Sequence, residues 1–227
     1  MPELPRAVEI ETGGTVRSSI VWLHGLGADG HDFEPVVPHL RLQDRGVRFV
    51  FPHAPRRAVT INMGLLMPAW FDVRSQDFGA NIDDAGIRAS VGQVEAIVAR
   101  EKERGVAAER ILLAGFSQGG VIALHTALRH PERLAGILAL STFLPQDSSA
   151  QDELSAANAG LPIFMGHGDE DPMIPIAWAE AARDRLEGIG HPVQWKSYPM
   201  GHQVCAEEIE DIGAWIRERL GSLPAGT

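Results

Sequence analysis

Gly115-Phe116-Ser117-Gln118-Gly119 is the stretch that decides the fold of this chain. The residues before it, 110–114, are apolar like a short buried strand, and residues 120–128 are rich in helix formers. A serine in so tight a strand-to-helix turn has strained backbone angles, and glycines two positions away on either side avoid collisions with neighbouring elements. The turn exposes the hydroxyl of Ser117 beside the free N–H groups of the helix, where an oxyanion is favoured. We therefore interpret Ser117 as a candidate nucleophile.

The composition predicts one globular domain over residues 1–227 without disulfides, and acyl transfer by a serine nucleophile needs no metal or organic cofactor. The chain is 44% hydrophobic and 22% charged, and Cys205 is its only cysteine. A net charge of −10 argues against nucleic acid or anionic membrane as the main partner. The first residues lack a signal-peptide pattern and no apolar stretch could cross a bilayer, so we expect a cytoplasmic protein without stable membrane insertion. A weak homodimer is left open.

Strand-like and helix-like segments alternate along the chain. Strands are expected at residues 19–23, 47–51, 110–114, 134–140, 162–166 and 193–198, the last near an edge of the sheet. Helices are expected at residues 84–104, 118–129, 176–187 and 207–220. This alternation predicts an α/β fold with a mostly parallel sheet and helices on both faces. A hairpin through Gly13-Gly14, with residues 8–11 and 15–16 as its strands, is also expected.

A serine nucleophile needs a base and an orienting carboxylate, which follow it in the order acid, then histidine, in α/β-hydrolases. Two carboxylates follow the strand at 162–166. Asp171 precedes Pro172, which favours an extended or turn conformation, whereas Asp169 follows Gly168 and suits a turn-shaping role. From the residues alone we prefer Asp171 and keep Asp169 as an alternative.

The base should follow the last strand. His202 comes after the strand at 193–198 and after a glycine that permits close approach. His191 lies at the opposite end of that strand, and His125 and His130 come too early in the chain. His202 is therefore the candidate base.

An oxyanion hole needs two N–H donors. The amide of Gln118 directly follows the nucleophile, and the glycine-rich loop at 24–27 offers the amide of Leu26. We expect His24 to hold this loop rather than to take part in catalysis.

Five motifs occur in order over nearly the whole chain: Leu23-His24-Gly25-Leu26-Gly27-Ala28-Asp29-Gly30, Pro68-Ala69-Trp70-Phe71-Asp72, Gly115-Phe116-Ser117-Gln118-Gly119-Gly120, His167-Gly168-Asp169-Glu170-Asp171-Pro172 and Gly201-His202. Together they resemble the phospholipase/carboxylesterase family, which includes bacterial carboxylesterases and eukaryotic acyl-protein thioesterases. The resemblance implies a compact α/β-hydrolase fold without a large cap domain. It also implies a triad of Ser117, Asp171 and His202 with oxyanion donors at Leu26 and Gln118, and so favours Asp171 over Asp169.

Residues 61–71 are apolar and rich in methionine, without strong strand alternation. We interpret this loop as an adaptable acyl-binding surface formed by Met63, Leu65, Leu66, Trp70 and Phe71. The alternative is a loop that packs on the core, which is at least as good an interpretation for Trp70 and Phe71. Met63-Gly64-Leu65-Leu66 is bulkier than the glycine-rich version in relatives, which leaves the acyl chain length open.

The expected function is a serine carboxylesterase that hydrolyses small to medium acyl esters, with acyl-thioesters or lysophospholipids also within its chemistry. The first alternative is an acyl-protein thioesterase as the main activity. A peptidase or lactonase is disfavoured because no charged specificity pocket is evident. A non-catalytic scaffold that binds an acyl ligand or a protein is disfavoured because no triad member is missing. Cys205 as nucleophile is disfavoured because no elbow surrounds it.

Overall fold

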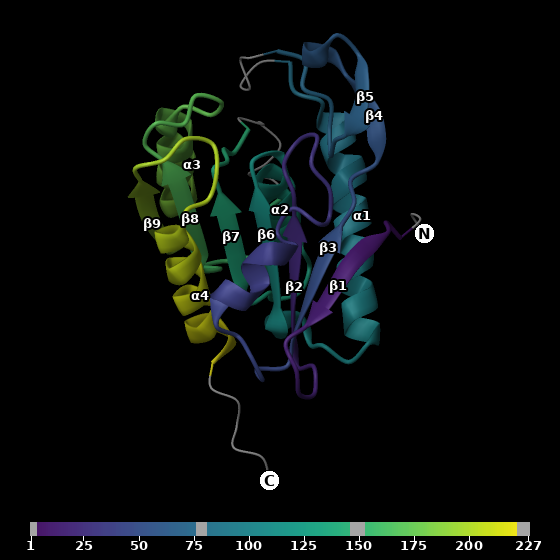
Figure 1. Cartoon of the computed structure of the whole chain (residues 1–227), viewed down its shortest axis with the longest axis vertical. Helices are drawn as coiled ribbons and strands as arrows, with labels where there is room; N and C mark the ends of the chain where they lie inside the picture. The colour runs from purple at the N-terminus through teal and green to yellow at the C-terminus, as the bar shows by residue number, and fades with distance from the viewer. Residues whose placement is uncertain (1–3, 76–80, 146–152, 222–227) are drawn as a thin grey trace.

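Seven strands form one sheet in the order β1-β3-β2-β6-β7-β8-β9 in the computed structural model (Figure 1). The structure describes residues 4–75, 81–145 and 153–221, so the predicted domain limits at 1 and 227 lie outside the described residues. The strands are β1 (Ala7–Glu11), β2 (Ser18–Leu23), β3 (Val47–Pro52), β6 (Ile111–Phe116), β7 (Gly136–Leu140), β8 (Ile163–Gly168) and β9 (Val193–Tyr198). Neighbouring strands are parallel except β1, which is antiparallel to β3. The predicted mostly parallel sheet is confirmed.

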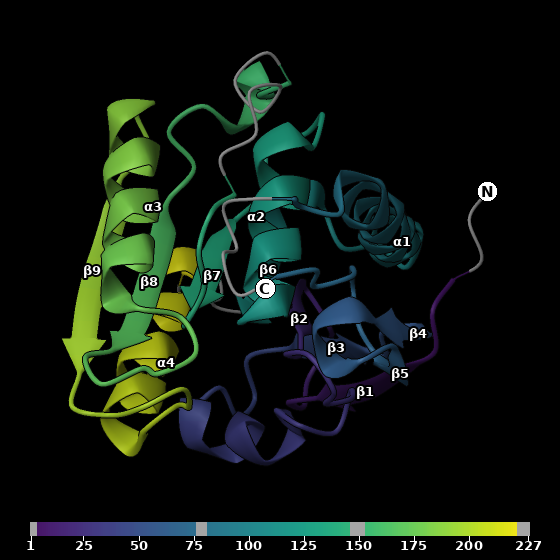
Figure 2. The ribbon, with the colours of Figure 1, turned by 90° about the horizontal axis from the view of Figure 1, so that it is seen from above.

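Helices cover both faces of this sheet (Figure 2). One face carries α1 (Asp84–Glu103), α2 (Gln118–Arg129) and α3 (Ile176–Gly188), and the other carries α4 (Ala206–Leu220) and the 3₁₀ helix η1 (Glu34–Leu40). In β2, Val21 and Leu23 pack into one core layer while Ile20 and Trp22 pack into the other. Because both faces are buried, the central strands read as continuous apolar runs. None of the helices in the described part of the chain has the length and apolarity that crossing a bilayer needs.

The observed strand boundaries differ from the predicted ones by one or two residues, and one predicted hairpin is not formed. Three strands run further than expected, to Pro52, Phe116 and Gly168, and the strand expected at 134–140 begins at Gly136. The predicted hairpin through Gly13-Gly14 is wrong, because β1 pairs with β3 from Ala7↔Pro52 to Glu11↔Arg48 and residues 15–16 lie in no strand. Five backbone pairs along the free edge of β3 stabilise β1 more than a two-residue partner strand could.

Residues 56–68 form a small antiparallel hairpin at the upper end of the molecule (Figure 1). It consists of β4 (Arg56–Val59), the 3₁₀ turn η2 (Thr60–Asn62) and β5 (Leu65–Pro68), with further short 3₁₀ turns at η3 (Ala108–Arg110) and η4 (Ala156–Asn158) elsewhere. The prediction of a loop over residues 61–71 is wrong for residues 65–68, which form β5. Within the described ranges, no second domain covers this end of the sheet.

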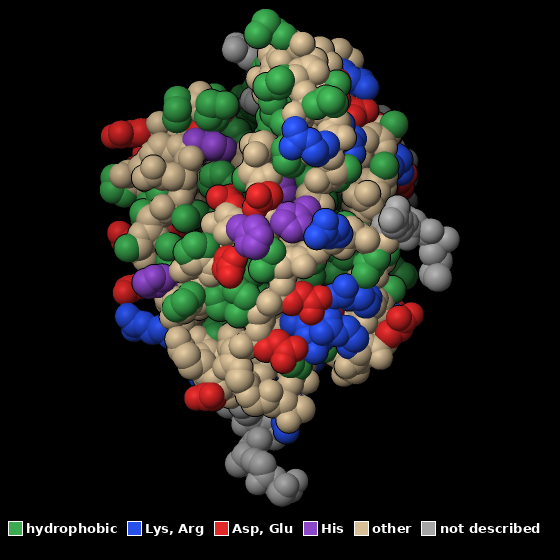
Figure 3. Space-filling view, turned by 45° about the vertical axis from the view of Figure 1, so that its right-hand side comes forward, with side chains coloured by type: hydrophobic (Ala, Val, Ile, Leu, Met, Phe, Trp, Pro, Cys, Tyr) green, Lys and Arg blue, Asp and Glu red, His purple; other side chains and the backbone are tan. Residues whose placement is uncertain are grey.

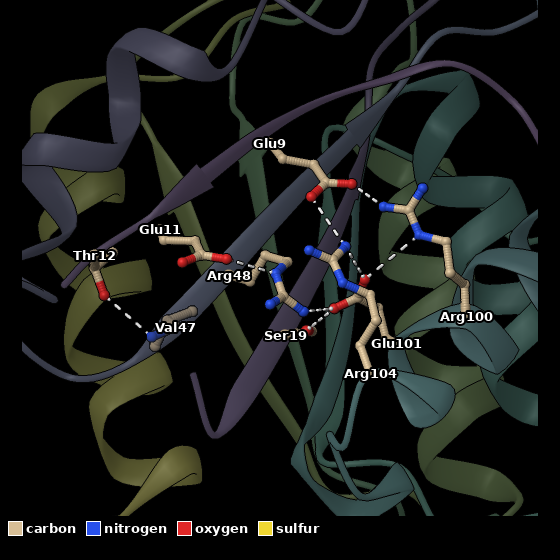
Figure 4. Close-up of polar contacts among 9 residues, drawn as sticks. All are labelled: Glu9, Glu11, Thr12, Ser19, Val47, Arg48, Arg100, Glu101 and Arg104. Atoms are coloured by element: carbon tan, nitrogen blue, oxygen red, sulfur yellow. Dashed lines mark hydrogen bonds and ion pairs between the residues drawn. The ribbon is translucent and has the colours of Figure 1, made fainter. Parts of the chain in front are cut away.

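A buried network of charges fastens α1 to the first three strands (Figure 4). The carboxylate of Glu101, at the end of α1, is fully buried and accepts hydrogen bonds from Ser19 on β2, Arg48 on β3 and Arg104. Arg48 also donates to Glu11 on β1 at 2.9 Å. Burial raises the pKa of Glu101, but the hydrogen bonds from Ser19 and Arg48 outweigh it and hold the pKa below its usual value. Glu101 is therefore a buried carboxylate that stays ionised and links four elements.

Candidate active site

Ser117 occupies the turn between β6 and α2 with φ 54° and ψ −121°, a left-handed φ that non-glycine residues rarely adopt. Its backbone N–H donates to the carbonyl of Leu140 on β7 at 2.9 Å, and its carbonyl accepts from Gly120 at 3.0 Å and from the Thr142 hydroxyl at 2.7 Å. These bonds hold the strained turn in place.

The two glycines of the turn are needed because other atoms occupy the space of a side chain. A Cβ on Gly115 would lie 2.3 Å from the carbonyl of Gly119, and a Cβ on Gly119 would lie 2.3 Å from the carbonyl oxygen of Leu23. The turn therefore has the tight packing that the sequence pattern indicates.

A chain of hydrogen bonds joins Ser117, His202 and Asp171. His202 Nε2 lies 2.9 Å from Ser117 Oγ, and its Nδ1 lies 2.7 Å from Asp171 Oδ2. The side chain of Asp171 is fully buried, whereas Asp169 is exposed and its N–H donates to the carbonyl of Tyr198. The structure thus brings Asp171, and not Asp169, to the histidine.

The carboxylate of Asp171 is held by a tight turn and by a second histidine. Its Oδ1 accepts from the N–H groups of Met173 at 2.8 Å and Ile174 at 2.9 Å. His167 Nε2 donates to the carbonyl of Ile174 at 2.8 Å and lies 3.5 Å from Asp171 Oδ2. Burial lowers the pKa of His167 and favours its neutral form. His167 is a site residue that the sequence prediction does not include, although its place four residues before Asp171 in one turn is a usable signal.

The two predicted oxyanion donors border the same cavity. Gln118 begins α2, so its N–H has no acceptor within the helix, and Leu26 lies in the loop after β2. His24 holds that loop: Nδ1 donates to the carbonyl of Gly25 at 2.7 Å, and Nε2 accepts from the N–H of Ala54 at 3.1 Å. Burial lowers the pKa of His24, consistent with a neutral ring in this role.

The side chain of Gln118 also holds the backbone of residues 70 and 71, a role that the sequence does not predict. Its Oε1 accepts from the N–H of Trp70 and its Nε2 donates to the carbonyl of Phe71, both at 2.7 Å. The indole of Trp70 donates to the carbonyl of His24 at 2.9 Å. Residues 70–71 are thus attached to both the elbow and the loop after β2, and Trp70 is fully buried behind the site.

Ser117 and His202 open onto a cavity of about 550 Å³. Its apolar lining consists of Leu26, Ala28, Ile61, Met67, Phe71, Val73, Phe116, Phe143, Met173 and Ile174. Of the five predicted acyl-binding residues only Phe71 lines the cavity. Met63, Leu65 and Leu66 are 99%, 63% and 60% exposed, and hydrophobic side chains are seen on the outside of the upper end of the molecule in Figure 3.

The arrangement suits acyl transfer by a serine nucleophile: a hydroxyl hydrogen-bonded to an imidazole, an oriented imidazole, backbone donors and an apolar cavity. Among the described residues, no three His, Cys, Asp or Glu side chains are grouped to hold a metal ion.

Comparison with known proteins supports this interpretation. Residues 6–220 match the family model of phospholipases and carboxylesterases. The chain is 35% identical over 213 residues to acyl-protein thioesterase 1 of Gibberella zeae, covering 89% of this chain and 91% of that protein. It is 37% identical to acyl-protein thioesterase 1 of Neurospora crassa, covering 89% and 87%.

Solved structures agree with the fold. SOBER1 of Arabidopsis thaliana superposes with a TM-score of 0.85 at 33% identity, covering 91% of this chain and 100% of that structure. The carboxylesterase of Bacillus cereus, at 20% identity, has a TM-score of 0.77 with 96% of each chain covered and supports the fold alone. The chain therefore belongs to the phospholipase/carboxylesterase family and is a serine hydrolase with the α/β-hydrolase fold.

Proposed function

We propose that this hydrolase is a carboxylesterase that cleaves small to medium acyl esters through Ser117, His202 and Asp171. The observation that carries the proposal is the continuous hydrogen-bond chain from Ser117 Oγ through His202 to the buried carboxylate of Asp171. The apolar cavity beside Ser117 supports an acyl group as the bound part of the substrate.

In the acylation step, Ser117 Oγ attacks the carbonyl carbon while His202 Nε2 accepts the hydroxyl proton. Asp171 holds the Nδ1 proton of His202, so that Nε2 is the free acceptor, and stabilises the imidazolium that forms. The amides of Leu26 and Gln118 donate to the oxyanion, each contributing about 3 kcal/mol of barrier lowering.

Collapse of the tetrahedral intermediate breaks the bond to the leaving group, which takes its proton from His202 Nε2. Water then attacks the acyl-enzyme while His202 accepts its proton, and release of the acid regenerates Ser117. The neutral His167 beside Asp171 leaves the negative charge of that carboxylate for His202.

A thioesterase activity is the second candidate, because the two fungal relatives are named acyl-protein thioesterases. Esters and thioesters present the same acyl carbonyl to the same groups. Lysophospholipids, whose acyl chains are esters, also fall within this chemistry.

A fluorophosphonate label tests the nucleophile. We expect a single adduct on Ser117 after digestion, no adduct in Ser117→Ala, and no hydrolysis of p-nitrophenyl butyrate by that variant. An adduct on Cys205, or full activity in Ser117→Ala, would refute the proposal. Absence of hydrolysis by the wild-type protein would favour a non-catalytic acyl-binding scaffold.

The substrate class is tested by one rate series. We would measure kcat/KM for p-nitrophenyl esters of increasing acyl length beside acyl-thioesters of the same acids. A maximum at short or medium esters supports the carboxylesterase, whereas consistently higher values for the thioesters would transfer the proposal to the thioesterase.

A further inference from the structure

One charged side chain of the cavity lining has no part in the proposed mechanism. Asp32 is the only Asp, Glu, Lys or Arg among the described residues that line the cavity with Ser117 and His202. It comes from the loop between β2 and η1. A lone carboxylate in a largely apolar lining imposes a preference on whatever charge a substrate brings there.

Asp32 lies on the side of the cavity that the leaving group of the substrate occupies. The next residue, Phe33, contacts Phe116 with ring centroids 5.7 Å apart, and Phe116 contacts the ring of His202 at 4.8 Å. The loop of Asp32 therefore adjoins the histidine side of the cavity. Because His202 Nε2 must deliver its proton to the leaving group, the leaving group occupies that side.

Burial and two nearby ionisable groups act on the carboxyl group of Asp32. Burial by the surrounding walls raises the pKa of its carboxyl, although the residue is solvent-accessible; His24 opposes this rise and the negative charge of Asp29 adds to it. Within residues 4–75, 81–145 and 153–221, no salt bridge to Asp32 is found. The nearby His24 is kept neutral by its own burial.

Other negative groups lie on the same loop and at the start of η1. Asp29 accepts from the N–H of His31, and Glu34 pairs with the ring of His31 at 2.8 Å. Figure 3 shows acidic and histidine side chains gathered near the middle of one face of the molecule. A cationic group that reaches Asp32 therefore also meets the negative charge of Asp29, whereas the charge of Glu34 is paired with His31.

We propose that Asp32 is a specificity-determining residue that selects substrates whose leaving group carries a positive charge, such as a quaternary ammonium, and disfavours anionic leaving groups. The inference rests on the proposed esterase function. A cation about 6 Å from the carboxylate, at an effective dielectric between about 40 and 80, gains roughly a three- to tenfold preference.

The test uses a pair of esters that differ only in charge. Butyrylcholine and 3,3-dimethylbutyl butyrate have nearly the same shape, but only the first is cationic. We expect wild-type kcat/KM to favour butyrylcholine by about three- to tenfold and Asp32→Asn to abolish most of that ratio. The ratio does not depend on the fraction of active enzyme, so partial misfolding of the variant cannot imitate the effect.

Two further measurements separate a charge effect from a change of shape. High salt should reduce the wild-type ratio, because the Debye length falls from about 10 Å at 0.1 M to about 3 Å at 1 M. Butyrate esters of 3-hydroxypropanoate, which have an anionic leaving group, should be cleaved faster by Asp32→Asn than by the wild type.

Asp29→Asn is the matched control, since it removes a carboxylate from the same loop at a residue that does not line the cavity. It should retain most of the wild-type ratio. Equal ratios in wild type and Asp32→Asn, or an equal loss in both variants, would overturn the role of Asp32 while leaving the esterase intact. Failure of the wild type to hydrolyse any of these esters would instead refute the proposed function.

Discussion

A buried carboxyl group in α4 allows a quantitative test of how burial controls stability. Glu208 lies in the first turn of this helix, and it is fully buried. Its Oε1 lies so close to Gly166 of β8 that a Cβ there would approach it to 2.1 Å. Neither carboxyl oxygen has a well-formed hydrogen bond within the described residues. Burial raises the pKa of Glu208 to about 8, the charge of Asp211 adds to this, and the amide of Cys205 opposes it.

The sign of the pH dependence follows from proton binding. Between pH 4.5, the ordinary value for glutamate, and pH 8, the folded protein keeps the proton of Glu208 and the unfolded chain releases it. The unfolded state therefore binds fewer protons, and the free energy of unfolding falls as pH rises through this range. Each pH unit costs about 1.4 kcal/mol, so the penalty at pH 7 is about 3 kcal/mol and reaches about 5 kcal/mol above pH 8.

Glu208→Gln removes the titration and keeps the side-chain volume, with a neutral amide in place of the carboxyl group. We expect it to be about as stable as the wild type near pH 4.5 and about 3 kcal/mol more stable at pH 7. Urea denaturation of both proteins at pH steps from 5 to 9 measures the difference. Glu207→Gln, at the exposed neighbouring residue, is the control and should stay parallel to the wild type. A difference for Glu208→Gln that does not change with pH would refute the reasoning.

Three other changes give results that the structure predicts. Gly119→Ala should lower the free energy of unfolding by more than about 3 kcal/mol, because its Cβ meets a carbonyl of β2 at 2.3 Å. Gly92→Ala, where the space in α1 is open, should raise the free energy of unfolding by about 0.5–1 kcal/mol in the same urea titration. Glu101→Gln should lower the free energy of unfolding by about 3 kcal/mol, since the buried guanidinium of Arg48 loses its ionised partner. Asp171→Asn should reduce kcat for p-nitrophenyl butyrate about 10⁴-fold, whereas Asp169→Asn should stay within about twofold; similar losses in both would remove the distinction between them.

The residues of the candidate site could be found from the sequence because each depends on local backbone and on strand order. The turn at Ser117 needs glycines at fixed spacing, because a Cβ added to Gly115 or Gly119 would lie less than 2.5 Å from backbone atoms. Asp171 and His202 each follow a buried strand, and parallel strands bring their carboxyl ends to one edge. These constraints act over a few residues, so a single sequence expresses them.

Contacts between segments distant in the chain could not be predicted in the same way. The side chain of Gln118 holds residues 70 and 71 through both of its amide atoms, and nothing in the sequence pairs these positions. The strand β5 escaped notice because its residues are exposed or half-buried without alternation, so the two-residue period that marks a strand is missing. Its structure comes from backbone pairing with β4 instead.

The difference between local sequence patterns and contacts of distant segments also decides which residues set the acyl preference. The apolar pattern at 63–66 suggested that bulky residues fill the site, but three of them are exposed at the hairpin tip while Met67 and Phe71 line the cavity. The opposing apolar surface comes from Phe143 and Ile174, which belong to segments after β7 and β8. Cavity width therefore depends on how the β4–β5 hairpin packs against those segments. Since Met63, Leu65 and Leu66 do not line this space, we expect acyl chain length to depend on Met67 and Phe71 rather than on the bulk of residues 63–66.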